Sequence, residues 1–151
     1  PKMLNCEMQS VEAELIKIAK TQNEEVIGLE TVSEQLAVFD AIPYQEQMNE
    51  LVITAKDNMQ RDKTELTEMM AIYKSENVEA MVTFTEKSPN AMTSKYSDVL
   101  LKKRNQNWIS RMTTIATNKP TFFGVGAAHL GGKNGVIALL RKAGFTVEAV
   151  Y

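Results

Sequence analysis

The sequence predicts an α/β fold: a short, mainly parallel sheet flanked by helices, with a helical insertion between the sheet strands. Three observations lead to this prediction. Residues 26–29 form a nearly unbroken apolar run, which is typical of a strand covered on both faces. Residues 121–125 are β-branched or aromatic at most positions, which favours a strand. Residues 135–151 continue as a helical pattern and a last apolar run, completing a right-handed strand–helix–strand unit.

The first helix is expected over residues 8–20, because its apolar residues recur at helical spacing. The strand at residues 26–29 follows and ends on Glu30. Ser33 is then a candidate cap for a short helix that reaches Phe39.

The insertion is expected over residues 43–118 and is helical throughout. Pro43 suits a first helical turn, and Asn77 suits a cap. Apolar residues at helical spacing predict core-facing stripes on two helical segments, and the set comprises Tyr44, Met48, Leu51, Val52, Ala55, Met59, Leu66, Met69, Met70 and Tyr73. A longer helix over residues 92–117 places every fourth residue on one face, namely Tyr96, Leu100, Arg104, Trp108 and Met112.

The final helix is bounded by residues typical of its two ends. Asn134 is a candidate cap before Gly135. Arg141 and Lys142 lie in the last turn, where positive charge suits the helix dipole, and Gly144 suits the position just after the helix.

Composition narrows the function classes. The chain has 151 residues, a formal net charge of -2 and a pI near 5.5, which argues against nucleic-acid binding. No apolar run approaches membrane-span length. The single cysteine, Cys6, excludes an internal disulfide. We expect residues 1–151 to be one domain or a fragment of one; a start at Pro1 without a signal-like segment favours a fragment or a processed piece.

The stretch TFFGVGAAHLGG, residues 121–132, carries the only histidine, His129, on a glycine-rich bend. Small residues such as Gly126 leave room for a ligand or another backbone. A dinucleotide fingerprint fails, because His129 occupies the place of the third glycine, and no Gly-Lys-Ser/Thr follows for a phosphate loop. Two interpretations stay open: His129 is a metal ligand or general base, or it packs in a turn and caps a helix.

Glu30 and Arg104 also allow two interpretations each. Glu30 is a site carboxylate, or else a solvated loop acid or a charge at a helix N-terminus. Arg104 interrupts an apolar stripe, so it needs a partner. Arg104 either reaches a site carboxylate or an anionic substrate group, or it extends its charged end to solvent or ties the helix to the sheet through a structural ion pair.

Three motifs resemble the TraB/GumN family, which includes the Tiki metalloproteases. They are VIGLETVSEQ at residues 26–35, RNQNW at residues 104–108, and GVGAAHLGGKNGVIALLRKAGFTVEAV at residues 124–150. The resemblance covers nearly all of this chain but only the C-terminal half of a typical member, whose first half carries another G-x-x-H and its own glutamate.

The resemblance implies a metal-dependent, peptidase-like hydrolase with a divalent metal ion and a peptide substrate. Carried over, His129 and Glu30 are metal ligands and catalytic residues, and Arg104 orients a carboxylate or stabilises negative charge. Gly126, Asn105, Trp108 and Gln35 are substrate-binding or site-supporting positions. Because a hydrolytic metal needs about three protein ligands, three alternatives stay open: the upstream half of the family domain completes the site, a second chain completes it, or this chain is inactive alone. Family members often carry export signals, which implies a periplasmic or secreted location. The alternative is a non-catalytic α/β domain that binds a peptide or another ligand.

Overall fold

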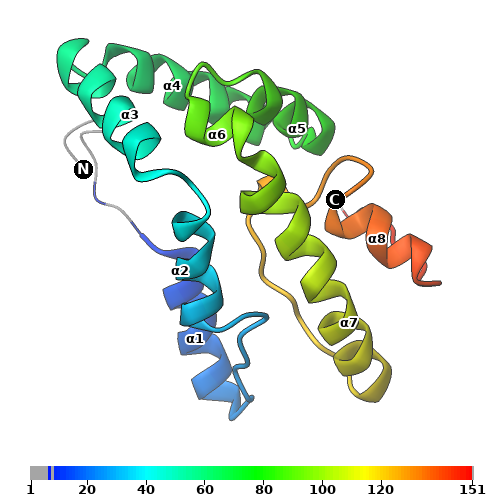
Figure 1. The fold of residues 1–151 in the computed structure, drawn as a ribbon. Coiled ribbons are helices and arrows are strands. Elements are labelled where there is room, and N and C mark those ends of the chain that lie inside the picture. The colour runs from blue at the N-terminus through cyan, green and yellow to red at the C-terminus, as the bar shows by residue number, and fades with distance from the viewer. Residues whose placement is uncertain (1–6, 8, 151) are drawn as a thin grey trace.

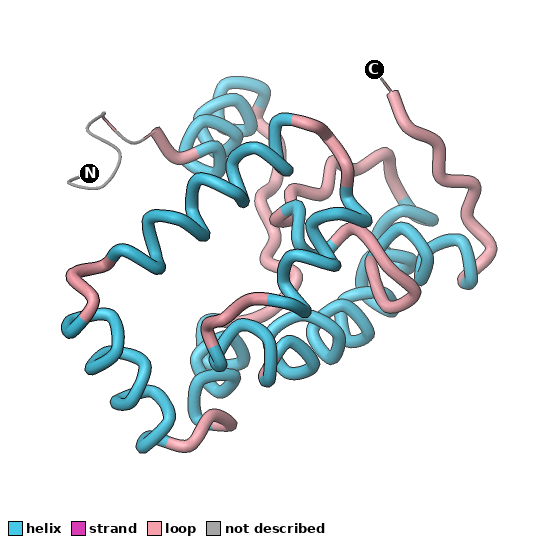
Figure 2. Tube along the Cα trace, turned by 90° about the horizontal axis from the view of Figure 1, so that it is seen from above, coloured by secondary structure: helices cyan, strands magenta, loops and turns pink. Residues whose placement is uncertain are grey.

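The computed structural model describes residue 7 and residues 9–150, and the chain is helical (Figures 1 and 2). The α-helices are α1 (Val11–Gln22), α2 (Val32–Asp40), α3 (Tyr44–Lys56), α4 (Gln60–Lys74), α5 (Val78–Lys87), α6 (Ala91–Lys95), α7 (Lys103–Asn118) and α8 (Val136–Lys142). A π-helical turn, η1 (Asp98–Lys102), precedes α7, and a 3-10 turn, η2 (Ala127–His129), precedes α8. In Figure 1, α3 to α6 lie together at the top, and α7 descends from them beside α8.

The predicted α/β fold is wrong, because residues 9–150 contain no strand and therefore no sheet. The three segments expected as strands, residues 26–29, 121–125 and 145–150, lie outside the helices, but no backbone hydrogen bond joins one of them to another. Strand-like composition reflects how side chains fit a pleated, half-buried surface and does not supply a neighbouring strand. The strand–helix–strand unit is accordingly a coil–helix–coil unit around α8.

Most predicted helices are present, with shifted boundaries. Asn77 caps α5 as expected, since its side chain accepts a hydrogen bond from the backbone of Ala80. The cap of α2 is Thr31 rather than Ser33, and it forms a reciprocal capping box with Glu34. Gly135, not Asn134, precedes α8.

The long helix predicted over residues 92–117 is divided. The helix α6 ends at Lys95, and the wider η1 turn separates it from α7. The amide of Lys103 bonds to the carbonyl of Asp98, five residues earlier. A π-helical hydrogen bond spans five residues where an α-helical one spans four, so the turn contains one extra residue and changes the direction of the side chains beyond it. From Lys103 onward α7 is a regular helix carrying Arg104, Asn105 and Trp108.

The main apolar core lies where α7 meets α8. Trp108, Met112 and Val136 are buried there, and partly buried side chains pack around them: Leu29, Ile109, Phe123, Val125 and Leu140. This core fixes α7 against the segment that carries His129. No helix within the described ranges is both long enough and apolar enough to cross a membrane.

The predicted core-facing stripes on α3 and α4 are wrong. Tyr44, Leu51 and Tyr73 remain 76%, 63% and 59% exposed. Helical periodicity identifies an apolar face but does not identify what covers it.

Candidate functional site

Glu30 and Arg104 form a bidentate ion pair between the start of α2 and the first turn of α7. Arg104 Nη2 donates to Glu30 Oε1 at 2.5 Å, and Arg104 Nε donates to Glu30 Oε2 at 3.1 Å. The indole Nε1 of Trp108, one turn further along α7, also donates to Glu30 Oε2 at 3.1 Å. Arg104 additionally donates to the carbonyl of Leu100. The side chains of the pair are only 17–18% exposed, so its geometry is held by packing as well as by charge.

The environment of Glu30 favours its charged form. Partial burial on its own raises the pKa of the carboxyl, but the hydrogen bonds from Arg104 and Trp108 and the positive charge of Arg104 outweigh burial and lower the pKa below its ordinary value. Glu30 is therefore an anion at neutral pH and a weak proton acceptor.

Asn105 holds His129 by both sides of its amide. Its Nδ2 donates to the carbonyl oxygens of His129, at 3.2 Å, and Asn134, at 2.8 Å. This fixes the direction of the amide, so Asn105 Oδ1 faces His129 Nδ1 at 2.6 Å. Since Oδ1 only accepts, Nδ1 must carry the proton. The hydrogen-bond network thus assigns the Nδ1–H tautomer and leaves the lone pair of Nε2 free.

His129 is kept neutral by its surroundings. The residue is 8% exposed, and burial lowers its pKa to about 4, helped by the charge of Arg104 and opposed by that of Glu30. A neutral imidazole with an available Nε2 is the form that binds metal ions or accepts a proton.

Trp108 joins the two pairs into one cluster. Its ring lies 4.5 Å from the His129 ring between centroids, tilted by 39°, and the Arg104 guanidinium lies 5.0 Å from the Trp108 ring. We call these five residues the α7 cluster: Glu30, Arg104, Asn105, Trp108 and His129. Three of them are supplied by little more than one turn of α7, which makes that turn the scaffold of the site.

The α7 cluster borders an open cleft of about 820 Å³ between α2 and α7. Glu30, Arg104 and Trp108 line it, whereas His129 does not. Lys103 and Arg111 add positive charge on the α7 side, and the side chains of Ile27, Ala37 and Val38 are among its apolar lining. A separate, smaller pocket of about 80 Å³ is lined by Asn105, Ala128 and residues 131–135, among others.

Gly126 and Gln35, the two other predicted site residues, are not part of the α7 cluster. Gly126 is the residue before η2, and a Cβ atom built on it would lie 3.8 Å from His129 Cδ2, so it is close to the ring. Gln35 lies on the exposed surface of α2 and does not line the cleft.

Sequence reasoning missed Arg111 and Asn134. Arg111 donates to the carbonyl of Leu29 and lines the cleft. Its spacing of seven from Arg104 is a signal that could have found it, because residues seven apart share a helix face. Asn134 acts through its backbone carbonyl, which no side-chain pattern reveals.

The donor set for a metal ion is only partly present. Within residues 7 and 9–150, no group of three or more histidine, cysteine, aspartate or glutamate side chains is arranged to hold an ion. His129 fits one ligand position, because a metal-binding histidine usually donates its other ring N–H to an oxygen, as His129 does to Asn105. The residues described do not fit a complete three-ligand centre.

The chain was compared with protein families, curated proteins and solved structures. No curated protein and no solved structure is similar enough to this chain to be matched. Among protein families, the TraB/PrgY/gumN family matches residues 1–149, essentially the whole chain. The chain therefore belongs to the TraB/PrgY/gumN family.

Proposed function

We propose that this chain supplies the histidine-bearing part of a metal-dependent hydrolase site that acts on peptides. The observation that supports the proposal best is the setting of His129, whose Nδ1–H is held by Asn105 while Nε2 stays free. An oxygen acceptor behind a neutral imidazole orients the ring and raises its basicity toward a metal ion. Hydrolytic metal ions act by polarising a substrate oxygen and activating a water molecule.

Glu30 and Arg104 also have roles in the proposed metal site. Glu30 Oε2 accepts two hydrogen bonds, but Oε1 accepts one, so Oε1 retains a lone pair for a metal ion. Arg104 then holds the carboxylate in place and brings positive charge to the cleft. The remaining ligands would come from outside the residues described, either from an upstream part of a longer chain or from a second chain.

The proposal is tested by titrating Zn²⁺, Mn²⁺ and Co²⁺ into the untagged protein by calorimetry, in a Cys6→Ser background that removes thiolate binding. Binding is expected for the parent protein, loss of binding for His129→Ala, and about 10–100-fold weaker binding for Asn105→Ala, because Asn105 orients the ligand. Asn107→Ala on the same helix is the control. Equal affinities for the parent and His129→Ala would contradict the assignment.

A second candidate function is peptide or ligand binding without catalysis. The observation that favours it is the cleft itself: Glu30, a carboxylate that lines it, already accepts three hydrogen bonds from Arg104 and Trp108, and His129 does not line the cleft. Trp108 is the only tryptophan and lines the cleft, so its fluorescence reports on occupancy. A peptide that shifts this fluorescence without turnover or metal, and that no longer does so in Val38→Asp, would support binding alone.

A further inference from the structure

Arg111 lines the cleft between α2 and α7 without a carboxylate partner among the described residues. Its Nη1 donates a hydrogen bond to the backbone carbonyl of Leu29 at 3.2 Å. A guanidinium carries five N–H donors, so this bond orients Arg111 and leaves other donors for an anion. Arg141 likewise donates to a backbone carbonyl, that of Val147, but it lies on α8 and does not line the cleft.

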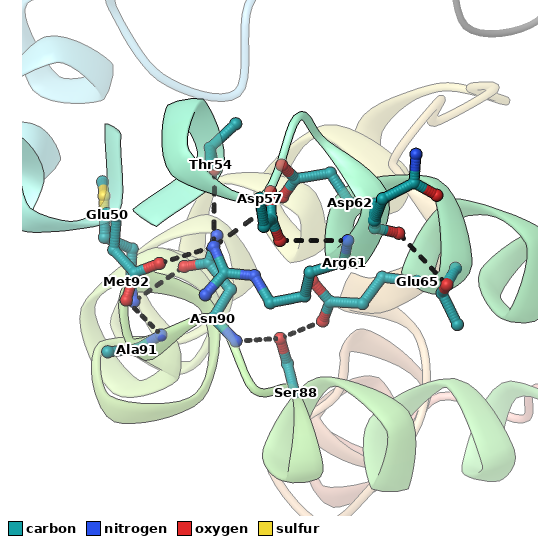
Figure 3. A network of polar contacts seen from close by, with 12 residues as sticks. Glu50, Thr54, Asp57, Arg61, Asp62, Glu65, Ser88, Asn90, Ala91 and Met92 are labelled. Atoms are coloured by element: carbon teal, nitrogen blue, oxygen red, sulfur yellow. Dashed lines mark hydrogen bonds and ion pairs between the residues drawn. The ribbon is translucent and has the colours of Figure 1, made fainter. Parts of the chain in front are cut away.

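The two remaining arginines are already paired with carboxylates. Arg104 is paired with Glu30. Arg61 is paired with Glu50 of α3 at 2.8 Å, inside a network that is rich in negative charge. The carboxylates drawn in this network are Glu50, Asp57, Asp62 and Glu65 (Figure 3). An anionic ligand would be repelled there, so Arg111 is the arginine of the cleft that is available to one.

Arg111 belongs to a line of hydrogen-bond donors on α7. Lys103, Asn107 and Arg111 are spaced by four residues, so they follow one another along one side of the helix. All three are exposed and line the cleft. We call these three residues the donor stripe. It is about 12 Å long, because an α-helix rises 1.5 Å per residue.

The opposite wall of the cleft is mainly apolar. Ala37 and Val38 of α2 line it together with one carboxylate, that of Glu34. Glu34 is held in the capping box of α2, where its Oε2 accepts from the backbone N–H of Thr31 at 2.6 Å. The charged residues that line the cleft are the cations Lys103, Arg104 and Arg111 and the anions Glu30 and Glu34. The cleft thus carries an excess of positive charge in a chain whose net charge is -2, which complements a ligand that is both anionic and apolar.

We propose that the donor stripe binds the carboxylate of a peptide whose apolar side chains lie against Ala37 and Val38. Arg111 makes the main contact, because a guanidinium meets a carboxylate with two parallel N–H···O bonds. This inference rests on the proposal that the cleft takes peptides, and it adds the chemical class of the peptide. A free C-terminal carboxylate and an acidic side chain offer the same chemistry, and the test separates them.

The test is titration of the fluorescence of Trp108, the only tryptophan, with four-residue peptides in EDTA at low ionic strength. Four extended residues span about 13 Å, the length of the donor stripe. The probes are acetyl-Ala-Ala-Val-Leu with a free C-terminal carboxylate, the same peptide as its amide, and acetyl-Ala-Glu-Val-Leu-amide. The parent protein should bind at least one of the two anionic peptides about 5–10-fold more tightly than the uncharged amide. The peptide that gains affinity identifies the source of the carboxylate.

Four variants locate the contact. Arg111→Gln should bring the affinities for the anionic and uncharged peptides within about twofold of each other, whereas Arg141→Gln, the matched control, should keep them apart. Glu34→Gln should strengthen binding of the anionic peptide alone, since glutamine still completes the capping box while the opposing negative charge is gone. Circular dichroism checks the helices. If Arg111→Gln loses helicity, Lys103→Gln replaces it, with a smaller preference expected.

Equal affinities of the parent protein for all three peptides would overturn the proposal. So would the absence of a saturable fluorescence change up to about 5 mM peptide, where even weak binding of this kind is visible. A preference that Arg111→Gln and Arg141→Gln retain equally would also overturn it, because another group would then bind the carboxylate. No metal ion takes part in these measurements, so the calorimetric test of His129 can fail while the carboxylate preference stands, and the reverse.

Discussion

Asn105 connects more of the candidate site than any other side chain of the α7 cluster. It is 2% exposed, and its amide serves the carbonyls of His129 and Asn134 and the ring of His129. Truncating it leaves two buried polar groups of His129 and the partly buried carbonyl of Asn134 without their partner. We therefore predict that Asn105→Ala lowers the free energy of unfolding by about 2–4 kcal/mol, since each unsatisfied buried group costs about 1–3 kcal/mol.

Urea denaturation measures this difference. Asn107→Ala is the matched control, because Asn107 lies two residues further along α7 and is exposed, so its loss should cost less than about 0.5 kcal/mol. Similar losses for the two variants would mean that the amide of Asn105 does not hold His129 as described.

The pH dependence of stability follows from His129. Its folded pKa of about 4 lies below its ordinary value of 6.5. Between these values the unfolded chain binds the proton and the folded chain does not, so stability falls as the pH drops from 6.5 toward 4 and is unaffected above that window. The full loss approaches about 3 kcal/mol at pH 4.

Urea denaturation of the parent and of His129→Leu, both in EDTA at pH 7, 5.5 and 4, isolates this effect. The lowered pKa of Glu30 adds a loss below its ordinary value of 4.5, but Glu30 is present in both proteins. The parent should lose more stability than His129→Leu between pH 6.5 and 4. Parallel curves would show that His129 titrates normally and is not buried as a neutral ring.

Several side chains of the α7 cluster could be singled out from the sequence, but the way they contact one another could not. Glu30, Arg104 and His129 were indicated by motif and by an arginine in an apolar stripe, and the four-residue spacing places Arg104 and Trp108 on one face. That Asn105 holds the His129 ring could not be predicted, because the contact joins residues 24 apart through the packing of η2 against α7. The catalytic and metal-binding roles remain predictions.

At the scale of elements, the turn between η2 and α8 depends on Gly135. A Cβ atom at this position would clash with the backbone carbonyl oxygens of Gly131 and Leu130. These oxygens cannot move away without disrupting the turn. We predict that Gly135→Ala lowers the free energy of unfolding by about 3 kcal/mol or more, at the upper end of overpacking effects.

Thermal denaturation of Gly135→Ala measures this loss, and Gly126→Ala is the control. Its added Cβ would make an ordinary contact with His129, and its φ of -62° suits any residue, so a change within about 1 kcal/mol is expected. If Gly135→Ala lowered the free energy of unfolding as little as Gly126→Ala, the carbonyl oxygens of Gly131 and Leu130 would not lie as close to position 135 as described.

Helices were largely predictable and strands were not, for a physical reason. A helix closes its hydrogen bonds within a few residues, so local signals such as Asn77 before α5 or Gly144 after α8 suffice. A strand needs a partner from elsewhere in the chain. Residues 26–29 and 121–125 have strand-like composition, but they do not pair with each other. The η1 turn left no sequence signal that distinguished it from a continuous helix.

At the scale of the whole molecule, stability is unevenly distributed. The helices α1 and α2 contain no buried residue, whereas α7 buries Asn105, Trp108 and Met112. Segments with few buried contacts open at low free-energy cost. We predict that amides in the middle of α1 and α2 exchange hydrogen at least about 100-fold faster than those in the middle of α7.

Hydrogen–deuterium exchange followed by mass spectrometry tests this gradient on peptides from residues 11–40 and 103–118. Equal protection across both regions would mean that α1 and α2 are held by a surface not apparent in the isolated chain. It would also mean that the cleft between α2 and α7 does not open freely, because α2 forms one of its walls.

The state of His129 is tested most directly by nitrogen-15 NMR of the untagged protein at pH 6, with metal removed. The chain has a single histidine, so its two ring nitrogens need no further assignment to a residue. The network around Asn105 predicts a neutral ring with Nδ1 protonated and Nε2 bare, ready to bind a metal ion or accept a proton. A ring protonated on Nε2, or a doubly protonated imidazolium at pH 6, would contradict this arrangement and remove the main support for a hydrolytic site in this chain.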